Sequence, residues 1–169
     1  MRWGQLPRVP TVSARKMPAQ KPGQSRQDYS TPRELIDAVE VRFGKLTFDL
    51  AATAKNSITG SRYWSPLQDS LNKNWTHRKL GTNLWLNPPF GDIEPWAKKC
   101  SETIGKKIFF LVPASVGSNW YKNYVHSVAS IYFLSPRLSF DGKNPYPKDV
   151  ILAIYGTRVG LHECWRWKS

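Results

Sequence analysis

Cysteine, acidic side chains and long apolar runs are all scarce in this sequence, and each scarcity narrows the class of protein. The 169 residues contain two cysteines, Cys100 and Cys164, with no Cys-x-x-Cys pair and no Cys/His cluster, which argues against a disulfide scaffold and a zinc site. No run approaches the roughly eighteen apolar residues of a membrane span, and the N-terminus lacks the apolar segment of a signal peptide. We therefore expect an intracellular protein with no membrane partner and no metal.

The charge balance points to a partner. Only 12 acidic residues oppose 25 lysines and arginines, so the formal net charge is +13. Such a surplus indicates a polyanionic partner, with nucleic acid the leading candidate. Hydrophobic residues make up 40% of the chain, enough for a packed core at this length, so we expect one globular domain.

Residues 1–28 differ in composition from the rest of the chain. They combine prolines and basic side chains with almost no apolar periodicity, which predicts a mobile basic N-terminal arm. The arm either contacts nucleic acid or only keeps the terminus soluble, and both interpretations fit the charge. Residues 29–169 would then form the single domain.

Helical and strand patterns alternate after residue 30. Thr31, Pro32 and Glu34 form an S/T-x-x-E capping box with proline at the first helical position, and Gly44 ends that helix. Further helices are expected at 93–104 and 118–128, and strands at 45–50, 84–86, 107–112, 131–134 and 150–155. This order predicts an α/β fold, a mostly parallel sheet with helices on both faces and an antiparallel edge formed by the final segments.

Ligands of open α/β sheets bind beyond the carboxyl ends of the strands, so the residues that leave each strand matter most. Here these are Asp49 after the first strand, the stretch Asn87-Pro88-Pro89-Phe90 after the second, and 113–115 after the third. One acid, one amide and one aromatic ring on the same rim predict a pocket for a nucleoside-like ligand and a planar substrate.

The stretch Asn87-Pro88-Pro89-Phe90 has a specific chemistry. The Asn87 side-chain oxygen and the Pro88 carbonyl, held by two rigid residues, are paired acceptors for an exocyclic amino group, while Phe90 offers a face for stacking. An amino group that donates two such bonds loses conjugation with its ring, so its lone pair becomes able to attack an electrophilic carbon. The alternative is that the prolines only terminate a strand.

Six motifs in order give the sequence a family resemblance. It resembles the phage-type DNA adenine-N-6 methyltransferases between residues 28 and 156. The motifs are Thr31-Pro32; Asp49-Leu50-Ala51-Ala52 with Asn56; Tyr63 and then Asp69-Ser70-Leu71 with Trp75; Asn87-Pro88-Pro89-Phe90; Leu111-Val112-Pro113-Ala114; and Arg137-Leu138-Ser139-Phe140.

This resemblance implies a Rossmann-like methyltransferase fold, S-adenosylmethionine as methyl donor and double-stranded DNA as substrate. It implies that Asn87, Pro88 and Phe90 hold a flipped adenine and that Pro89 keeps their turn rigid. The residues it places around the cofactor are Tyr29, Ser30, Thr31, Asp49, Leu50, Ala51, Asp69, Ser70 and Leu71. A phage origin, and with it the host cytoplasm and a role in protection from restriction or in regulation, is implied in the same way.

Basic and polar residues in the loops are candidates for DNA contact, and we expect those loops to flank the rim. They are Lys73, Arg78, Lys79, Ser118, Arg137 and Lys143. Solvated loops would have the same composition. His77, His126 and His162 are expected to lie far apart as ordinary loop or surface residues, and Trp96 is expected in the core.

Two kinds of rival remain. One is a methyltransferase of another amino nitrogen: cytosine N-4, RNA adenine or a glutamine side chain. The other is a catalytically silent DNA-binding module. The positive charge disfavours a protein substrate, and the intact Asn87-Pro88-Pro89-Phe90 stretch disfavours the silent module. For the assembly we expect a monomer or a weak dimer.

Overall fold

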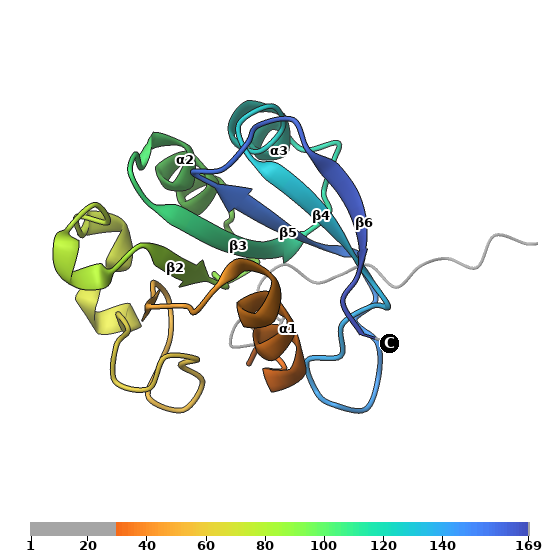
Figure 1. Cartoon of the computed structure of the whole chain (residues 1–169), viewed down its shortest axis with the longest axis horizontal. Helices are drawn as coiled ribbons and strands as arrows, with labels where there is room; N and C mark the ends of the chain where they lie inside the picture. Colours follow the sequence, from red (N-terminus) through yellow and green to blue (C-terminus); the bar gives the residue numbers. More distant parts are fainter. Residues whose placement is uncertain (1–29, 169) are drawn as a thin grey trace, which may run out of the picture.

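The computed structural model describes residues 30–168, which form one six-stranded sheet with α-helices on both of its faces (Figure 1). The α-helices are α1 (Arg33–Phe43), α2 (Glu94–Glu102) and α3 (Asn119–Tyr124). The strands are β1 (Phe48–Asp49), β2 (Asn83–Leu86), β3 (Lys107–Pro113), β4 (Ser130–Ser135), β5 (Val150–Tyr155) and β6 (His162–Arg166). The 3-10 helices η1 (Pro66–Gln68), η2 (Ser70–Asn72) and η3 (Arg78–Leu80) lie within the long connection between β1 and β2. Within 30–168 no helix is long and apolar enough to cross a membrane.

The sheet has the strand order β1-β2-β3-β5-β4-β6. The pairs β1/β2, β2/β3 and β4/β6 are parallel, whereas β5 is antiparallel to both of its neighbours. The predicted mostly parallel sheet is therefore confirmed. The predicted antiparallel edge is wrong, because the antiparallel strand lies in the interior of the sheet and the edge strand β6 is parallel to β4. All six residues of β5 are buried, as expected of a strand covered on both faces.

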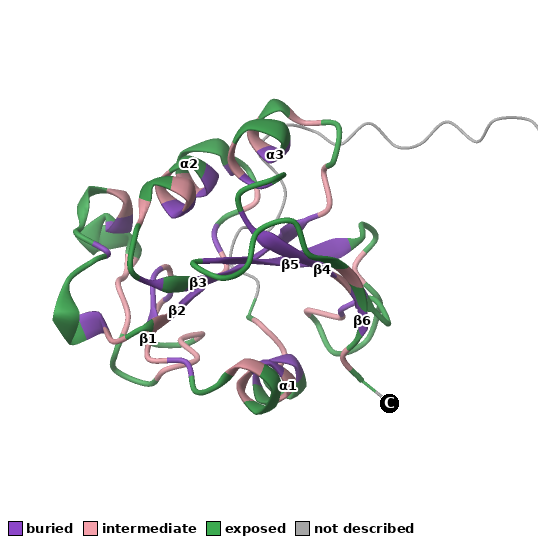
Figure 2. Ribbon diagram, turned by 45° about the horizontal axis from the view of Figure 1, so that its top comes forward, coloured by how far each residue is buried: buried purple, intermediate pink, exposed green. Residues whose placement is uncertain are grey.

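Helices cover both faces of the sheet, as predicted, with α2 and α3 on one side and α1 on the other (Figure 2). Successive side chains of β3 point to opposite faces. Ile108, Phe110 and Val112 pack with α2 and α3, while Phe109 and Leu111 pack with α1. The sheet thus separates two cores, and its strand ends are left for loops.

The start of α1 differs from the prediction. The helix begins at Arg33, Pro32 occupies the cap position, and no side chain caps the first turn. The capping box is wrong because the Thr31 hydroxyl accepts a hydrogen bond from the Asn87 side chain instead, at 3.2 Å. Gly44, at φ 96°, ends the helix as predicted.

The other two α-helices are shorter than their patterns suggested. α2 ends at Glu102, so Ile104 lies beyond it and is 84% exposed. The hydroxyl of Ser118 caps α3 as predicted, but the helix ends at Tyr124 and Val128 is 39% exposed. In both cases an apolar residue that continued the helical spacing lies outside the helix.

Strand β6 was not predicted, because only Trp165 of its five residues is buried and the strand carries little apolar signal. Side chains tie it to α1. The Arg42 guanidinium donates two hydrogen bonds to Glu163, at 2.9 and 2.8 Å, and lies over the rings of Phe43, Tyr132 and Trp165. The hydrogen bond from Arg42 lowers the pKa of Glu163. The strand therefore anchors the helix that begins beside Asn87.

Candidate active site

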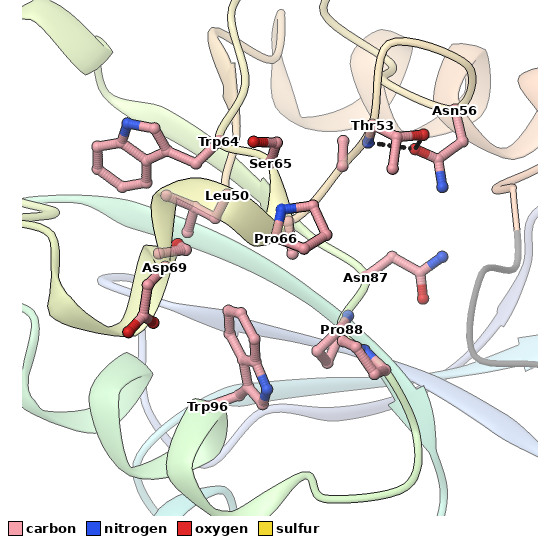
Figure 3. A pocket seen from close by; sticks show the side chains of 14 residues that line it. Leu50, Thr53, Asn56, Trp64, Ser65, Pro66, Asp69, Asn87, Pro88 and Trp96 are labelled. Atoms are coloured by element: carbon pink, nitrogen blue, oxygen red, sulfur yellow. Dashed lines mark hydrogen bonds between the residues drawn. The ribbon is translucent and has the colours of Figure 1, made fainter.

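A cavity of about 290 Å³ opens where β1 and β2 end (Figure 3). Its walls combine aromatic and proline rings with a few polar side chains, as is usual for sites that bind small organic molecules. The lining residues come from three segments: Leu50, Ala51, Ala52, Thr53 and Asn56; Trp64, Ser65, Pro66, Asp69 and Ser70; and Asn87, Pro88, Pro89 and Trp96.

Asp49 supports the cavity from below and does not line it. Its side chain is buried, with the residue only 2% exposed, and its carboxylate accepts hydrogen bonds from the backbone N–H groups of Ala51 and Ile58, both at 3.2 Å. Burial raises the pKa of this carboxyl to about 6, although the two backbone hydrogen bonds oppose the shift. The carboxylate thus fixes both ends of the loop that forms one wall.

That wall loop closes on itself. The Asn56 side-chain oxygen accepts hydrogen bonds from the backbone N–H of Thr53, at 2.6 Å, and from its hydroxyl, at 2.9 Å (Figure 3). With Asp49 below and Asn56 across the turn, the backbone of 50–53 has a defined path along the cavity.

The facing wall is the junction of η1 and η2. Asp69 adopts a left-handed conformation there, with φ 47°, which turns the chain so that Ser70 enters the interior. The Trp75 indole donates a hydrogen bond to the Ser70 carbonyl at 2.9 Å, and the Lys99 ammonium donates to the Leu71 carbonyl at 2.6 Å. A buried tryptophan and a lysine therefore hold the backbone of this wall.

The Ser70 side chain is distinctive among the lining residues. Ser70 is 4% exposed, and its hydroxyl has no hydrogen-bond partner within the part of the chain that the structure describes. Buried hydroxyls are normally paired, so a hydroxyl in this position is suited to a ligand.

The third wall is the turn after β2. Asn87, Pro88 and Pro89 line the cavity, and the Asn87 amide donates through Nδ2 to the Thr31 hydroxyl. This hydrogen bond joins the turn to the segment before α1, 56 residues earlier. It fixes which side of the amide presents the nitrogen and which presents the acceptor oxygen.

Phe90 does not line the cavity and belongs to an aromatic cluster. Its ring centroid lies 6.1 Å from that of Phe140 and 6.0 Å from that of Tyr146, and the last two are 5.3 Å apart. Edge-to-face contacts of this kind hold a ring in place. The cluster gives the Arg137-Leu138-Ser139-Phe140 motif a structural role, because Leu138 is buried in the core and Phe140 supports Phe90.

The sequence of the chain matches a known family. Residues 19–153 match the model of the family described as DNA N-6-adenine-methyltransferase (Dam). The chain belongs to the DNA N-6-adenine-methyltransferase family. The resemblance identified from the sequence is thereby confirmed. Strand β6 lies beyond the matched residues.

A relative from a phage carries the same description. The chain is 30% identical over 142 residues to a DNA N-6-adenine-methyltransferase of Escherichia phage T1. The alignment covers 82% of this chain and 58% of the phage protein, so the chain spans less than two thirds of that relative's length. No solved structure matches the chain.

The structure of this family member brings most of the predicted site residues together. Leu50, Ala51, Asp69 and Ser70 share the cavity with the proline turn. Thr31 reaches the site through Asn87, whereas Asp49 and Leu71 contribute through the loops they support. Ser30 is exposed and does not line the cavity, and Tyr29 and the arm at 1–28 lie outside the described residues.

Two tryptophans of the cavity were missed from the sequence. Trp64 and Trp96 both line it, and Trp96, expected in the core, is only half-buried and stacks on Trp75 with ring centroids 6.4 Å apart. The helical spacing of Trp96 indicated an inward side chain correctly. It did not reveal that this part of the interior is a cavity.

The predicted DNA contacts divide between two edges of the sheet. Ser118 and Lys143 follow strand ends on the side of the cavity, as does Arg137, which pairs with Asp149 at 2.8 Å. Arg78 and Lys79 were expected to flank the same rim, and this location is wrong. They form η3, just before β2, and therefore lie at the amino ends of the strands. Lys73 follows η2 in the connection between the two edges.

The histidines also differ from expectation. The rings of His126 and His162 lie side by side, with centroids 5.7 Å apart, although they were expected to be distant. Among the described residues, no group of three or more His, Cys, Asp or Glu side chains is arranged to hold a metal ion.

Proposed function

We propose that this chain transfers a methyl group from S-adenosylmethionine to the exocyclic N-6 amino group of adenine in double-stranded DNA. The observation that carries the proposal is the oriented Asn87 amide at a cavity wall, next to two prolines and a supported aromatic ring. Family membership supports adenine in DNA as the substrate.

The proline turn is the proposed adenine site. The Asn87 side-chain oxygen and the Pro88 carbonyl accept the two N–H bonds of the amino group, while Phe90 stacks against the base. Pro89 keeps the turn rigid. Because the amino group is otherwise engaged in base pairing, the adenine has to leave the duplex before it reaches these acceptors.

The residues of the cavity fit the cofactor. Trp64, Pro66 and Trp96 supply apolar ring surfaces for an adenine moiety, and the Asp69 carboxylate is suited to a hydroxyl or amino group. The buried Ser70 hydroxyl supplies one more polar contact. Leu50 and Ala51 bring the backbone after β1 close to the same ligand, and Leu71, Ser30, Thr31 and Tyr29 complete the proposed cofactor set.

The reaction needs a pair of hydrogen-bond acceptors and an amino nitrogen in line with the methyl carbon and the sulfur. S-adenosylmethionine would supply the methyl group from its sulfonium, and the sulfur would leave as the neutral thioether of S-adenosylhomocysteine. The N-6 lone pair forms the new nitrogen–carbon bond as the carbon–sulfur bond breaks, and the nitrogen releases one proton to water. Asn87 and Pro88 stabilise the amino group as it gains positive charge, since both present oxygen acceptors.

Further features remain predictions alongside this function. We propose a Rossmann-like methyltransferase fold, a single domain over residues 29–169, and a monomer or weak dimer in the host cytoplasm. Ser118, Arg137, Lys143 and Lys73 are proposed to contact the duplex around the site. Asp49 is proposed to act through the wall loop rather than on the cofactor.

The direct test measures tritium transfer from labelled S-adenosylmethionine to duplex DNA, followed by digestion to nucleosides. The expected product is N-6-methyladenine, and the transfer should be lost in Asn87→Ala. Parallel reactions with RNA, with duplex of guanine and cytosine only, and with protein test the other amino nitrogens. Label in N-4-methylcytosine, in RNA or in protein, with none in DNA adenine, would replace the proposal by the corresponding rival. Binding of DNA with no transfer at all would favour the silent module.

A further inference from the structure

The described loops at the amino ends of the strands are basic and contain no acidic residue. These loops comprise residues 44–47, 58–62, 76–82, 103–106 and 156–161, and Lys107, the first residue of β3, adjoins them. Their exposed cations are Lys45, Arg62, Arg78, Lys79, Lys107 and Arg158, and we call this surface the amino-end edge. The carboxyl-end loops, by contrast, mix acids with cations: Asp69, Asp92, Asp141 and Asp149 against Lys55, Arg137, Lys143 and Lys148.

Hydrogen bonds join these loops into one surface. The Lys45 carbonyl accepts from the Asn83 side chain at 3.0 Å, and the Arg62 guanidinium donates to the carbonyls of Thr47 and Lys79 at 2.8 and 2.7 Å. On the other side, the Ser130 hydroxyl donates to the Arg158 carbonyl. The loops that carry these cations are therefore connected, and the Arg62 guanidinium is part of the connection.

A buried lysine holds the middle of this framework. Lys106 is 9% exposed, and its ammonium donates hydrogen bonds to the carbonyls of His77 and Gly81, on either side of η3. Its own carbonyl is packed so closely against Gly156 that a Cβ there would lie 2.0 Å from the oxygen. The loops that carry Arg78, Lys79 and Arg158 thus meet around one internal positive charge.

The surface is also hollowed. A groove of about 550 Å³ runs between α1 and the start of β1, and Lys45 and Arg62 line it together with Thr47, Thr59 and Gly81. Arg33 and Glu40 form its far side, and Glu40 accepts a hydrogen bond from the backbone of Leu46 at 3.1 Å. A basic groove matches the shape and charge of a phosphate backbone.

The groove extends along α1 to Arg33, two residues after Thr31, and so approaches the proposed adenine site. The cations Arg78, Lys79, Lys107 and Arg158 and that site, by contrast, lie at opposite edges of the sheet. β3 has seven residues and spans about 20 Å between them. Duplex DNA has a persistence length of about 150 base pairs, so bending a short duplex round the molecule from the cavity to the other edge would be energetically costly. These cations therefore form a contact surface of their own.

We propose that the amino-end edge binds the phosphate backbone of a second segment of duplex DNA while the cavity engages the first. The choice of DNA as the ligand rests on the proposed function. Contacts between these cations and phosphates would carry no sequence information. Binding at this edge should weaken steeply with salt.

The test measures capture of a second duplex. A biotinylated duplex is saturated with the full-length protein on a surface, and a fluorescent duplex of alternating guanine and cytosine is added, so that neither strand of the probe contains adenine. The test variant is Lys45→Glu/Lys107→Glu, whose side chains are exposed at the amino-end edge. The matched control is Lys98→Glu/Arg166→Glu, with the same change of charge on α2 and β6, away from that edge.

Wild type and control should each capture one probe duplex per chain in addition to the immobilised duplex, which gives two duplexes per chain. The test variant should capture it on the order of tenfold more weakly, since two phosphate contacts are lost, while methylating a single short duplex as wild type does. Equal loss in the control, unchanged capture by the test variant, one duplex per chain, or capture of an RNA probe but not of DNA would each overturn the proposal. The probe lacks adenine and the assay needs no cofactor. Capture can therefore be measured even if the protein transfers no methyl group, so the two proposals fail separately.

Discussion

Within residues 30–168, each edge of the sheet buries one acidic or basic side chain, and the two have opposite sign. At the amino end, Lys106 is satisfied by two backbone carbonyls, and the loops around it add further cations. At the carboxyl end, Asp49 is satisfied by two backbone N–H groups, and the loops around it carry acids and cations together. One edge has charge and a groove, and the other has a mostly apolar cavity with oriented polar groups.

Two tasks are separated in this way: selection of an amino group and attraction of a polyanion. The net charge of +13 alone does not show where either takes place. Selection of an amino group needs a few acceptors in a fixed geometry, whereas attraction of a polyanion needs many cations in any geometry. In this chain the proposed acceptors and most of the amino-end cations lie at different ends of the same strands. The predictions below test whether the two ends are as independent as their structures indicate.

Asn87→Ala should give the largest effect on methyl transfer. This effect should concern the carboxyl-end site alone. Removal of one oriented polar group from such a site typically costs about 10²- to 10³-fold in kcat, and we expect a loss of this size in methyl transfer. The measurement is single-turnover transfer from labelled S-adenosylmethionine. Capture of a second duplex should be unaffected, and a parallel loss of capture would break the separation of the two edges.

The pH dependence of Asp49 should be the next largest effect. Its pKa is about 6 in the folded protein against an ordinary value of 3.8, so the folded state holds this proton more tightly than the unfolded chain. The stability it contributes is fully present below pH 3.8 and is lost as the pH rises through about 6. The loss amounts to about 3 kcal/mol, at about 1.4 kcal/mol per unit of pKa.

Asp49→Asn isolates this contribution. The difference in free energy of unfolding between wild type and variant, from urea denaturation at several pH values, should fall by about 3 kcal/mol between pH 3.8 and pH 7.5. Other titrating groups cancel in that difference. A difference that does not change with pH would mean that the carboxyl is more hydrated than its burial indicates.

Phe90→Ala should weaken the site through lost stacking. Stacking of a base on an aromatic side chain contributes about 1–3 kcal/mol, so kcat/KM for DNA should fall by about 5- to 150-fold. Phe140→Ala removes the support and leaves the Phe90 ring, so kcat/KM for DNA should fall by less in this variant. A larger effect in Phe140→Ala than in Phe90→Ala would contradict the assignment of Phe90 as the stacking residue.

Thr31→Val should give the smallest effect. A neutral hydrogen bond contributes about 0.5–1.5 kcal/mol, so kcat should fall by roughly 2- to 12-fold while KM for DNA changes little. Thr31→Ser keeps the hydroxyl and should restore the rate. If Thr31→Ser is as slow as Thr31→Val, the hydroxyl does not act through the Asn87 amide.

The site was predictable where its chemistry lies in consecutive residues. The proposed acceptors and the ring of Asn87-Pro88-Pro89-Phe90 follow one another, and within the α/β pattern their motif predicts a site for an amino group. Contacts between distant segments were not predictable in this way. Thr31 fits a capping box by local pattern, yet its hydroxyl bonds to Asn87, because a partner 56 residues away offers a donor that the helix start does not need.

The wrong location of Arg78 and Lys79 had a signal that could have corrected it. Both precede a strand that was predicted at 84–86, and residues that precede a strand of a parallel sheet lie at the amino end, opposite the ligand site. β6 had no such signal, because a single buried residue does not produce a strand pattern. The interior position of β5 depends on pairing with both β3 and β4, which its own sequence does not specify.

The most direct measurement compares three proteins on one short duplex: wild type, Asn87→Ala and Lys45→Glu/Lys107→Glu. After reaction with labelled S-adenosylmethionine, the DNA is digested and the amount of N-6-methyladenine is determined against time. Wild type and the amino-end variant should form N-6-methyladenine at equal rates, and Asn87→Ala should form almost none. The account is contradicted if wild type yields no N-6-methyladenine, or if Asn87→Ala yields as much as wild type.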